Sequence, residues 1–317
     1  MMKKYILLSL ALLCWFGVLY AQDRTESEIS IVNNNLTLYG TLKLGDTIKP
    51  TIVALIIAGS GPTDRDGNNP AANNNSLNML ANALGSNGIS SLRYDKRGVG
   101  KSKNAFIKEE NLRFEDYVSD AEAWIKKLKA DKRFTKVVVI GHSEGSLIGM
   151  LAIEHVGADV FISLSGAAKP ANEIIMEQLK SSPKDIQHEA QRIIDVLVTG
   201  KTTENVPSYL YQLFRPSVQP YMISWFKYNP VDELKKIKAP TVIVHGMNDI
   251  QVSTDDAIQL AQARPSSSLM VVKGMNHILK RMDENKEKNI ESYNDPKLPL
   301  SVDLVSGLVE YIYNNAR

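Results

Sequence analysis

Short apolar segments alternate with segments of helical periodicity along most of this chain. From Ile29 to Leu44, apolar and polar residues alternate on both sides of three asparagines, Asn33 to Asn35, which predicts a β-hairpin with a polar turn. After this hairpin, runs rich in β-branched residues predict buried parallel strands at Thr51 to Ala58, Ser90 to Tyr94, Lys136 to Ile140, Val160 to Leu164, Thr241 to His245 and Ser268 to Val272.

Amphipathic segments with the period of a helix lie between these strands. They are Leu77 to Leu84, Phe114 to Leu128, Leu147 to His155, Asp255 to Ala263 and Ser301 to Tyr313. We therefore expect an α/β fold with a mostly parallel, doubly wound sheet that opens with an antiparallel hairpin. The charged stretch from Lys280 to Lys288 lacks this pattern, and we expect it to be a solvated loop.

One interval between two predicted strands is too long to hold a single helix. About 70 residues separate Ser165 from Thr241, far more than one crossover between parallel strands requires. Within residues 171–239 the pattern is helical and rich in apolar and aromatic side chains, which predicts an inserted helical cap over a site. A helical excursion that only packs on the sheet edge is the alternative.

The amino terminus has the order of a secretory signal peptide. Lys3 and Lys4 precede an apolar run from Tyr5 to Tyr20, and Ala21 follows it. The run is shorter than the roughly 20 residues of a membrane-spanning helix, so a retained anchor is the weaker alternative. We expect cleavage of residues 1–21, and export of residues 22–317 to the periplasm or the medium.

Composition narrows the chemistry of the exported chain. The one cysteine, Cys14, lies inside the predicted signal, so the mature chain has neither a disulfide nor a thiol nucleophile. The full chain has 37 basic and 35 acidic residues, and loss of Lys3 and Lys4 makes it formally neutral. This balance gives no electrostatic footprint for nucleic acid or for an anionic membrane surface.

The segment Gly141-His142-Ser143-Glu144-Gly145 carries the clearest chemical signal. It follows the apolar strand that ends at Ile140 and precedes a helical run, which is the context of a G-x-S-x-G nucleophile elbow. Glycine allows strand and helix to approach closely around a strained serine at a helix amino terminus. Ser143 is therefore the predicted nucleophile, although an ordinary strand-to-helix turn has the same pattern.

A serine hydroxyl needs a base and an orienting acid, because it is a weak nucleophile near neutral pH. Asp249 follows the strand that ends at His245, and His277 follows the strand that ends near Val272. The order Ser143, Asp249, His277 agrees with the order that this kind of elbow uses. His277 is preferred as the base because the other histidines fall beside the serine, in helices or at a strand end: His142, His155, His188 and His245. Near the acid, Asp255 and Asp256 fall at a helix start, where capping is the preferred interpretation.

Two loops after early strands complete the candidate site. Gly59-Ser60-Gly61 ends the strand from Thr51, and we expect the Ser60 N–H and the Glu144 N–H to bind the substrate oxyanion. The charged residues 64–66 either hold this loop by ion pairs or contact substrate. The segment Tyr94 to Ser102 lacks the first glycine of a phosphate loop and is interpreted as a structural turn.

Together these motifs resemble the α/β-hydrolase superfamily. The segments 61–68 (GPTDRDGN), 93–98 (RYDKRG) and 141–145 (GHSEG) are similar to bacterial carboxylesterases of the EstD type, related to the serine aminopeptidase-like branch. The resemblance implies an α/β-hydrolase fold and hydrolysis of small-molecule carboxylic esters without cofactor or metal. Ala58 departs from lipase-like members, which often have a histidine before the oxyanion glycine.

These observations favour a serine carboxylesterase that works through an acyl-enzyme. A serine peptidase or aminopeptidase with the same triad is the alternative, with Glu109 and Glu110 as a possible site for a substrate amine. A catalytically silent binding module is the third interpretation. Esters, peptide anilides and an active-site probe distinguish the three.

Overall fold

A single mixed sheet forms the centre of the molecule. The computed structural model describes residues 25–105, 108–282 and 285–316, and the predicted signal peptide with Cys14 lies outside them. Within these residues the strand order is β1-β2-β4-β3-β5-β6-β7-β8. The strands are β1 (Glu26–Asn33), β2 (Leu36–Lys43), β3 (Thr51–Ile57), β4 (Ser90–Tyr94), β5 (Phe134–His142), β6 (Val160–Leu164), β7 (Thr241–Gly246) and β8 (Ser268–Val272).

The predicted topology is confirmed. Six strands, β4, β3, β5, β6, β7 and β8 in sheet order, run parallel to one another. Strand β2 pairs antiparallel with both β1 and β4. The hairpin turns through Asn34 and Asn35, whose φ angles are 49° and 62°. Asparagine tolerates this left-handed conformation, which a two-residue hairpin turn requires.

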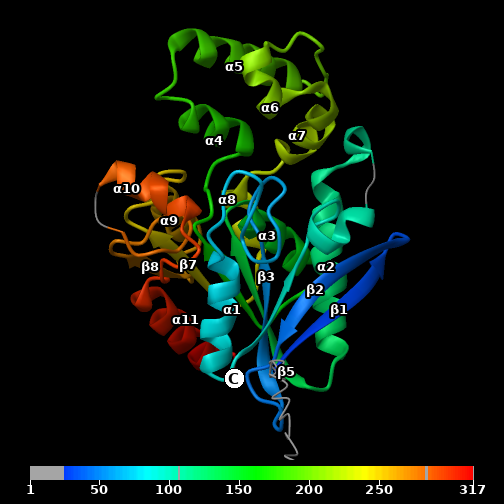
Figure 1. The fold of residues 1–317 in the computed structure, drawn as a ribbon, viewed down its shortest axis with the longest axis vertical. Coiled ribbons are helices and arrows are strands. Elements are labelled where there is room, and N and C mark those ends of the chain that lie inside the picture. The colour runs from blue at the N-terminus through cyan, green and yellow to red at the C-terminus, as the bar shows by residue number, and fades with distance from the viewer. Residues whose placement is uncertain (1–24, 106–107, 283–284, 317) are drawn as a thin grey trace, which may run out of the picture.

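Helices cover both faces of the sheet (Figure 1). They are α1 (Ser76–Ser86), α2 (Phe114–Ala130), α3 (Glu144–Val156), α4 (Ala171–Gln178), α5 (Lys184–Leu197), α6 (Tyr211–Phe214), α7 (Gln219–Trp225), α8 (Pro230–Lys236), α9 (Thr254–Ala263), α10 (Lys286–Glu291) and α11 (Val302–Asn315). Short 3-10 turns lie at Gly100–Asn104, Glu109–Asn111, Ser208–Leu210, Pro216–Val218 and Ser292–Asn294.

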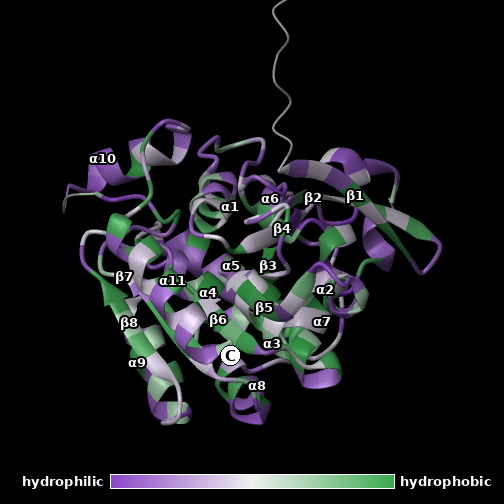
Figure 2. Ribbon diagram, turned by 90° about the horizontal axis from the view of Figure 1, so that it is seen from below, coloured by the Kyte–Doolittle hydropathy of each residue, from purple (hydrophilic) through white to green (hydrophobic). Residues whose placement is uncertain are grey.

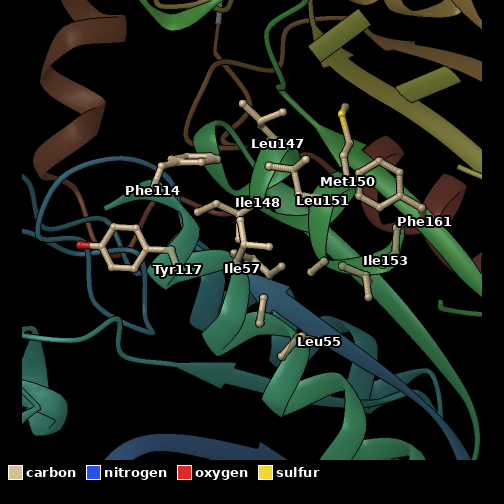
Figure 3. Packing of buried hydrophobic residues seen from close by; sticks show 14 of the residues in the cluster. Leu55, Ile57, Phe114, Tyr117, Leu147, Ile148, Met150, Leu151, Ile153 and Phe161 are labelled. Carbon is tan, nitrogen blue, oxygen red and sulfur yellow. The ribbon is translucent and has the colours of Figure 1, made fainter. Parts of the chain in front are cut away.

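The alternation of side chains in the strands builds a core on each face. In β3, Leu55 and Ile57 belong to the cluster with α2 and α3, whereas Ala54 and Ile56 belong to the cluster with α1 and α11. Figure 3 shows the first cluster, in which Ile148 of α3 is seen near Ile57 and Met150 near Phe161. Fully burying such an aliphatic side chain contributes about 1.5–3 kcal/mol to the free energy of unfolding. Figure 2 shows apolar strands inside and mixed helices around them.

The long interval between β6 and β7 is helical, as expected. Helices α4 to α7 stand above the sheet in Figure 1, beyond the end where the parallel strands finish. Helix α8 packs against α3 and α9 instead, so it belongs with the body of the domain. The predicted segment 171–239 thus contains four helices above the sheet and one that returns to it.

Two details differ from the sequence expectation. Strand β8 lies at the sheet edge, and Leu269 and Val271 are 42% and 40% exposed, so this strand is not buried. The stretch from Lys280 is not simply a solvated loop either, because Lys280 is fully buried and α10 begins at Lys286.

Among the described residues, no helix combines the length and the apolar character needed to cross a bilayer.

Candidate active site

Ser143 lies at a tight turn between β5 and α3. Its φ and ψ are 54° and −123°, a conformation that is costly for a residue with a side chain and that is typical of strained functional positions. The turn closes only because its neighbours are glycines. A Cβ at Gly141 would lie 2.2 Å from the Gly145 carbonyl oxygen, and a Cβ at Gly145 would lie 2.4 Å from that of Ile57.

Asp249 and His277 lie together beyond the ends of β7 and β8. His277 Nδ1 donates to Asp249 Oδ2 at 2.7 Å, and the Asp249 side chain is fully buried. The other oxygen, Oδ1, accepts from the backbone N–H groups of Gln251 and Val252 at 2.8 and 3.0 Å. Burial alone would raise the pKa of Asp249, but the charge and hydrogen bond of His277 hold it below its usual range. The carboxylate therefore stays ionised and leaves Nε2 of His277 free to act as a base.

His142 connects the serine turn to the His277 loop. Its Nε2 donates to the His277 carbonyl oxygen at 2.8 Å, and the two rings are 5.0 Å apart. Burial, followed by the nearby His277, lowers the pKa of His142 to about 4. The sequence placed His142 only beside the serine, whereas the structure places its ring against the candidate base.

The remaining histidines occupy structural positions. His245 is buried, donates from Nε2 to the Val252 carbonyl at 3.0 Å, and lies 3.6 Å from Asp249. His155 pairs with Glu122 on the helix surface, and His188 is exposed on α5. Asp255 and Asp256 both lie in the first turn of α9, but the N-cap is Ser253, whose side chain accepts from the Asp255 N–H. Asp255 is exposed, whereas Asp256 is buried and accepts from the Ala168 N–H at 2.9 Å, so the expectation that this pair caps the helix is wrong.

A cavity of about 450 Å³ joins the serine turn to the helices above the sheet. Ser143, Glu144 and Ser60 line its floor, and Gln251 and Val252 of the Asp249 loop contribute to its side. The inserted segment supplies much of the remaining lining through Ala171, Ile174, Ile175, Gln178, Gln212, Leu213, Arg215, Val218, Tyr221, Met222, Trp225 and Pro230. The lining is mostly apolar, which suits the uncharged portion of a small organic molecule.

The two candidate oxyanion donors flank the serine. Glu144 begins α3, so its N–H is one of the unpaired donors at a helix amino terminus. Ser60 belongs to the loop after β3, and a Cβ on the preceding Gly59 would lie 3.1 Å from Cβ of Ser143. Both residues line the same cavity as Ser143.

Ion pairs hold the segment 64–66, one of the two interpretations left open above. Arg65 contacts Asp95 at 2.6 Å, and Asp66 accepts from Arg93 at 2.8 Å. Asp64 caps its own turn by accepting from the N–H groups of Asp66 and Asn68. None of these three residues lines the main cavity.

A buried asparagine network supports the candidate acid and base, and sequence reasoning missed it. Asn276 donates to Asn289 Oδ1 at 3.0 Å, and Asn289 in turn donates to the Asn248 carbonyl at 2.7 Å. Asn276 and Asn248 directly precede His277 and Asp249. The repeated Gly-Met-Asn before each of these residues is the sequence signal that precedes both loops.

Comparison with solved structures identifies the fold of this chain. The α/β hydrolase GrgF from Penicillium sp. sh18 superposes with a TM-score of 0.58 at 16% identity, covering 92% of this chain and 99% of that one. The chain has the α/β-hydrolase fold. Est1E from Butyrivibrio proteoclasticus, in a structure with ferulic acid bound, aligns with this chain at a TM-score of 0.62 and 17% identity, over 90% and 98% of the two chains. The esterase Pf2001 from Pyrococcus furiosus aligns at 0.58 and 16%, over 92% and 93%.

Sequence comparison adds two relationships. Residues 73–210 of this chain match the family described as serine aminopeptidase, S33. Esterase EstD from Thermotoga maritima is 26% identical over 265 residues, which cover 82% of this chain and 62% of EstD. The chain thus spans less than two thirds of the length of that relative. In the described residues, no group of three or more His, Cys, Asp or Glu side chains is arranged to hold a metal ion.

Proposed function

We propose that this α/β-hydrolase is a serine carboxylesterase with Ser143 as nucleophile. The observation that carries the proposal is the hydrogen bond of 2.7 Å from His277 to buried Asp249, on a loop that His142 ties to the strained Ser143 turn. Ser143 itself lines a mostly apolar cavity. The likeness to EstD supports the choice of esters.

In the proposed reaction, Ser143 Oγ attacks the ester carbonyl carbon while its proton moves to Nε2 of His277. Asp249 stabilises the imidazolium, and the N–H groups of Ser60 and Glu144 bind the oxyanion. The carbon–oxygen bond to the alcohol then breaks, and His277 returns the proton to the leaving oxygen. Water, deprotonated by His277, attacks the acyl-enzyme and releases the acid with Ser143 restored.

The segment 171–239 has a defined role in this proposal as a substrate cap. Helices α4 and α7 contribute Ile174, Ile175 and Trp225 to the cavity that contains Ser143. A segment that only packed on the sheet edge would not line this cavity. We therefore assign the acyl group or the alcohol group of the ester to the space under these helices.

The match to the serine aminopeptidase family supports a second candidate, an aminopeptidase with the same triad. An aminopeptidase needs a carboxylate for the substrate amine, and Glu109 was the sequence candidate. In the structure Glu109 already accepts from Arg215 Nε at 2.8 Å and from Ser217 Oγ at 2.5 Å. The Arg215 hydrogen bond keeps the pKa of Glu109 below its usual range. The only carboxylate among the described residues of the main cavity, Glu144, lies 3.5 Å from Lys96.

Reaction with a fluorophosphonate probe, read by peptide mass spectrometry, tests the shared mechanism. We expect labelling of Ser143 in the wild-type chain and none in Ser143→Ala or after unfolding. p-Nitrophenyl esters and aminoacyl p-nitroanilides then separate the candidates, and we expect ester turnover to dominate. An unlabelled Ser143 in the folded chain would refute both, while faster anilide turnover would favour the aminopeptidase.

A further inference from the structure

Lys96 is a buried cation beneath the candidate oxyanion site. It follows β4 within the segment Tyr94 to Ser102, which the sequence pattern predicts to be a structural turn, and it is 1% exposed. Its Nζ donates to the Gly59 carbonyl oxygen at 2.6 Å and lies 3.5 Å from Glu144 Oε1. The ammonium also lies 5.1 Å from the ring centre of Tyr117. Lys96 therefore touches both segments that are proposed to bind the oxyanion.

The contact with Gly59 fixes a particular peptide unit. The Gly59 carbonyl and the Ser60 N–H belong to the same peptide bond, and the described chain contains no cis peptide bonds. In a trans peptide the C=O and the N–H point in opposite directions. A carbonyl held toward Lys96 therefore directs the Ser60 N–H away from Lys96, and Ser60 lines the cavity floor beside Ser143.

The contact with Glu144 reaches the second donor. The Glu144 side chain is 2% exposed and approaches Lys96, while its backbone N–H begins α3 directly after Ser143. Burial lowers the pKa of Lys96, and the Glu144 carboxylate opposes this shift. The pair places a buried positive charge against the carbonyl oxygen of the Gly59–Ser60 peptide. That charge polarises the peptide and makes its N–H a stronger donor.

We propose that Lys96 is a positioning residue that orients the Ser60 and Glu144 N–H groups for oxyanion binding. The inference rests on the proposed serine hydrolase function. Its competitor is a purely structural role in which Lys96 only neutralises the buried Glu144. The two differ in one respect: orientation of the Gly59 carbonyl is needed in the first and irrelevant in the second.

A double variant separates these roles. Lys96→Met with Glu144→Gln removes both charges, so no buried carboxylate is left uncompensated, but it also removes the donor to the Gly59 carbonyl. Loss of one oxyanion donor lowers kcat by about 10²–10³-fold in a serine hydrolase. The rate at which p-nitrophenyl butyrate acylates the enzyme is measured and divided by the number of sites that a fluorophosphonate titrates. We expect this rate to be at least roughly 30-fold lower in the double variant, and KM to change by less than about threefold.

Binding measurements give a second readout. A boronic acid forms a tetrahedral adduct on the serine, and its affinity should fall in parallel with the acylation rate, while the affinity for the product acid stays unchanged. Acylation and boronate binding within about threefold of wild type would overturn the proposal in favour of charge neutralisation. If the methionine variant does not accumulate folded, Lys96→Gln with Glu144→Gln takes its place. Its amide ends one bond short of the lysine nitrogen, and the same limits apply.

Two controls keep the outcomes distinct. Leu128→Ala opens the core at the far end of α2, where Leu128 is 1% exposed, so it reports what destabilisation alone does to rate per titrated site. We expect no change in that rate. Labelling and turnover of the wild-type chain test the proposed function separately. Their absence overturns both proposals, whereas an active wild type with an undiminished double variant overturns the role of Lys96 alone.

Discussion

The His142 imidazole donates from Nε2 to the backbone carbonyl of His277 across 2.8 Å. The residue before the proposed nucleophile thus holds the loop that carries the proposed base. This contact joins β5 to the segment after β8, although three strands separate these elements along the chain. The donor must be a neutral imidazole, because burial lowers the pKa of His142 to about 4.

A prediction about pH follows from this lowered pKa. Below pH 6.5 the unfolded chain takes up a proton at His142, while the folded chain resists it until about pH 4, so acid favours unfolding across that window. The contribution is on the order of 3 kcal/mol. In His142→Gln the amide retains a donor for the His277 carbonyl and does not titrate. Urea unfolding at pH 7.5 and 4.5 should therefore show a smaller loss of unfolding free energy in the variant. An equal loss in both chains would contradict the assignment.

The acid of the triad is tested by Asp249→Asn. An asparagine keeps the size of the side chain but allows His277 to adopt the wrong tautomer, so we expect kcat for an activated ester to fall by roughly 10⁴-fold. Asp255→Asn is the matched control, because Asp255 is exposed on α9 and the hydrogen bond from His277 goes to Asp249. Steady-state kinetics check both variants. Wild-type turnover in Asp249→Asn would mean that another acid orients the base.

The asparagine network predicts a role for α10 in catalysis. Asn289→Ala removes the contacts to Asn276 and to the Asn248 carbonyl, which brace the residues before His277 and Asp249. We expect kcat per titrated site to fall by about 10- to 100-fold, since small misplacements of reacting groups are costly. Asn285→Ala removes the amino-terminal cap of the same helix, where Asn285 accepts from the Lys288 N–H, and should affect stability alone. Equal kinetic effects of the two variants would argue against the brace.

Trp225 and Phe226 form a natural pair for testing the cap. Both are partly buried aromatic residues at the end of α7, but only Trp225 lines the main cavity, where it also stacks on Phe114 at 5.8 Å. We expect Trp225→Ala to change the ratio of kcat/KM for octanoate and butyrate esters by about 5- to 50-fold, because pocket contacts contribute about 1–3 kcal/mol of discrimination. Phe226→Ala should leave the ratio unchanged. An unchanged ratio in Trp225→Ala with a lower Tm would remove this role from the cap.

Periodicity predicted the body of the fold well because its strands are apolar runs and its helices each turn one apolar face to a core on one side of the sheet. The hairpin, the bounds of β4, β6 and β8, and the helices from Phe114 and Val302 agree with the sequence pattern to within a few residues. The exposure of β8 was missed because an apolar run does not reveal whether a strand has one neighbour or two. Helix α10 was missed because it is short and mostly charged, and tertiary contacts decide such segments. Helix α8 lies inside the segment expected to be helical, but its packing on α3 and α9 was not foreseen.

The candidate triad could be named from sequence because each residue directly follows a strand, and parallel strands finish at one edge of the sheet. The contacts that support these residues could not be predicted from the sequence. Lys96 and Asn289 act through backbone carbonyls of residues distant in sequence, at Gly59 and Asn248, and no residue pattern encodes which carbonyl a side chain will reach. The contact of His142 with the His277 carbonyl escaped prediction for the same reason.

The close approach at Gly141 and Gly145 has a consequence for how this chain can vary. Hardly any space separates the serine turn from β3, where even one added carbon would meet the Ile57 carbonyl at 2.4 Å. Nucleophile, oxyanion loop and strand must therefore move as one rigid block. Helices α4 to α7 lie outside this block and pack on the body of the domain through α2, where Trp225 stacks on Phe114. Side chains of these helices that face the cavity can therefore change without altering the serine turn. A library of substitutions confined to the cavity-facing side chains of these helices should therefore shift substrate preference far more often than it abolishes labelling of Ser143.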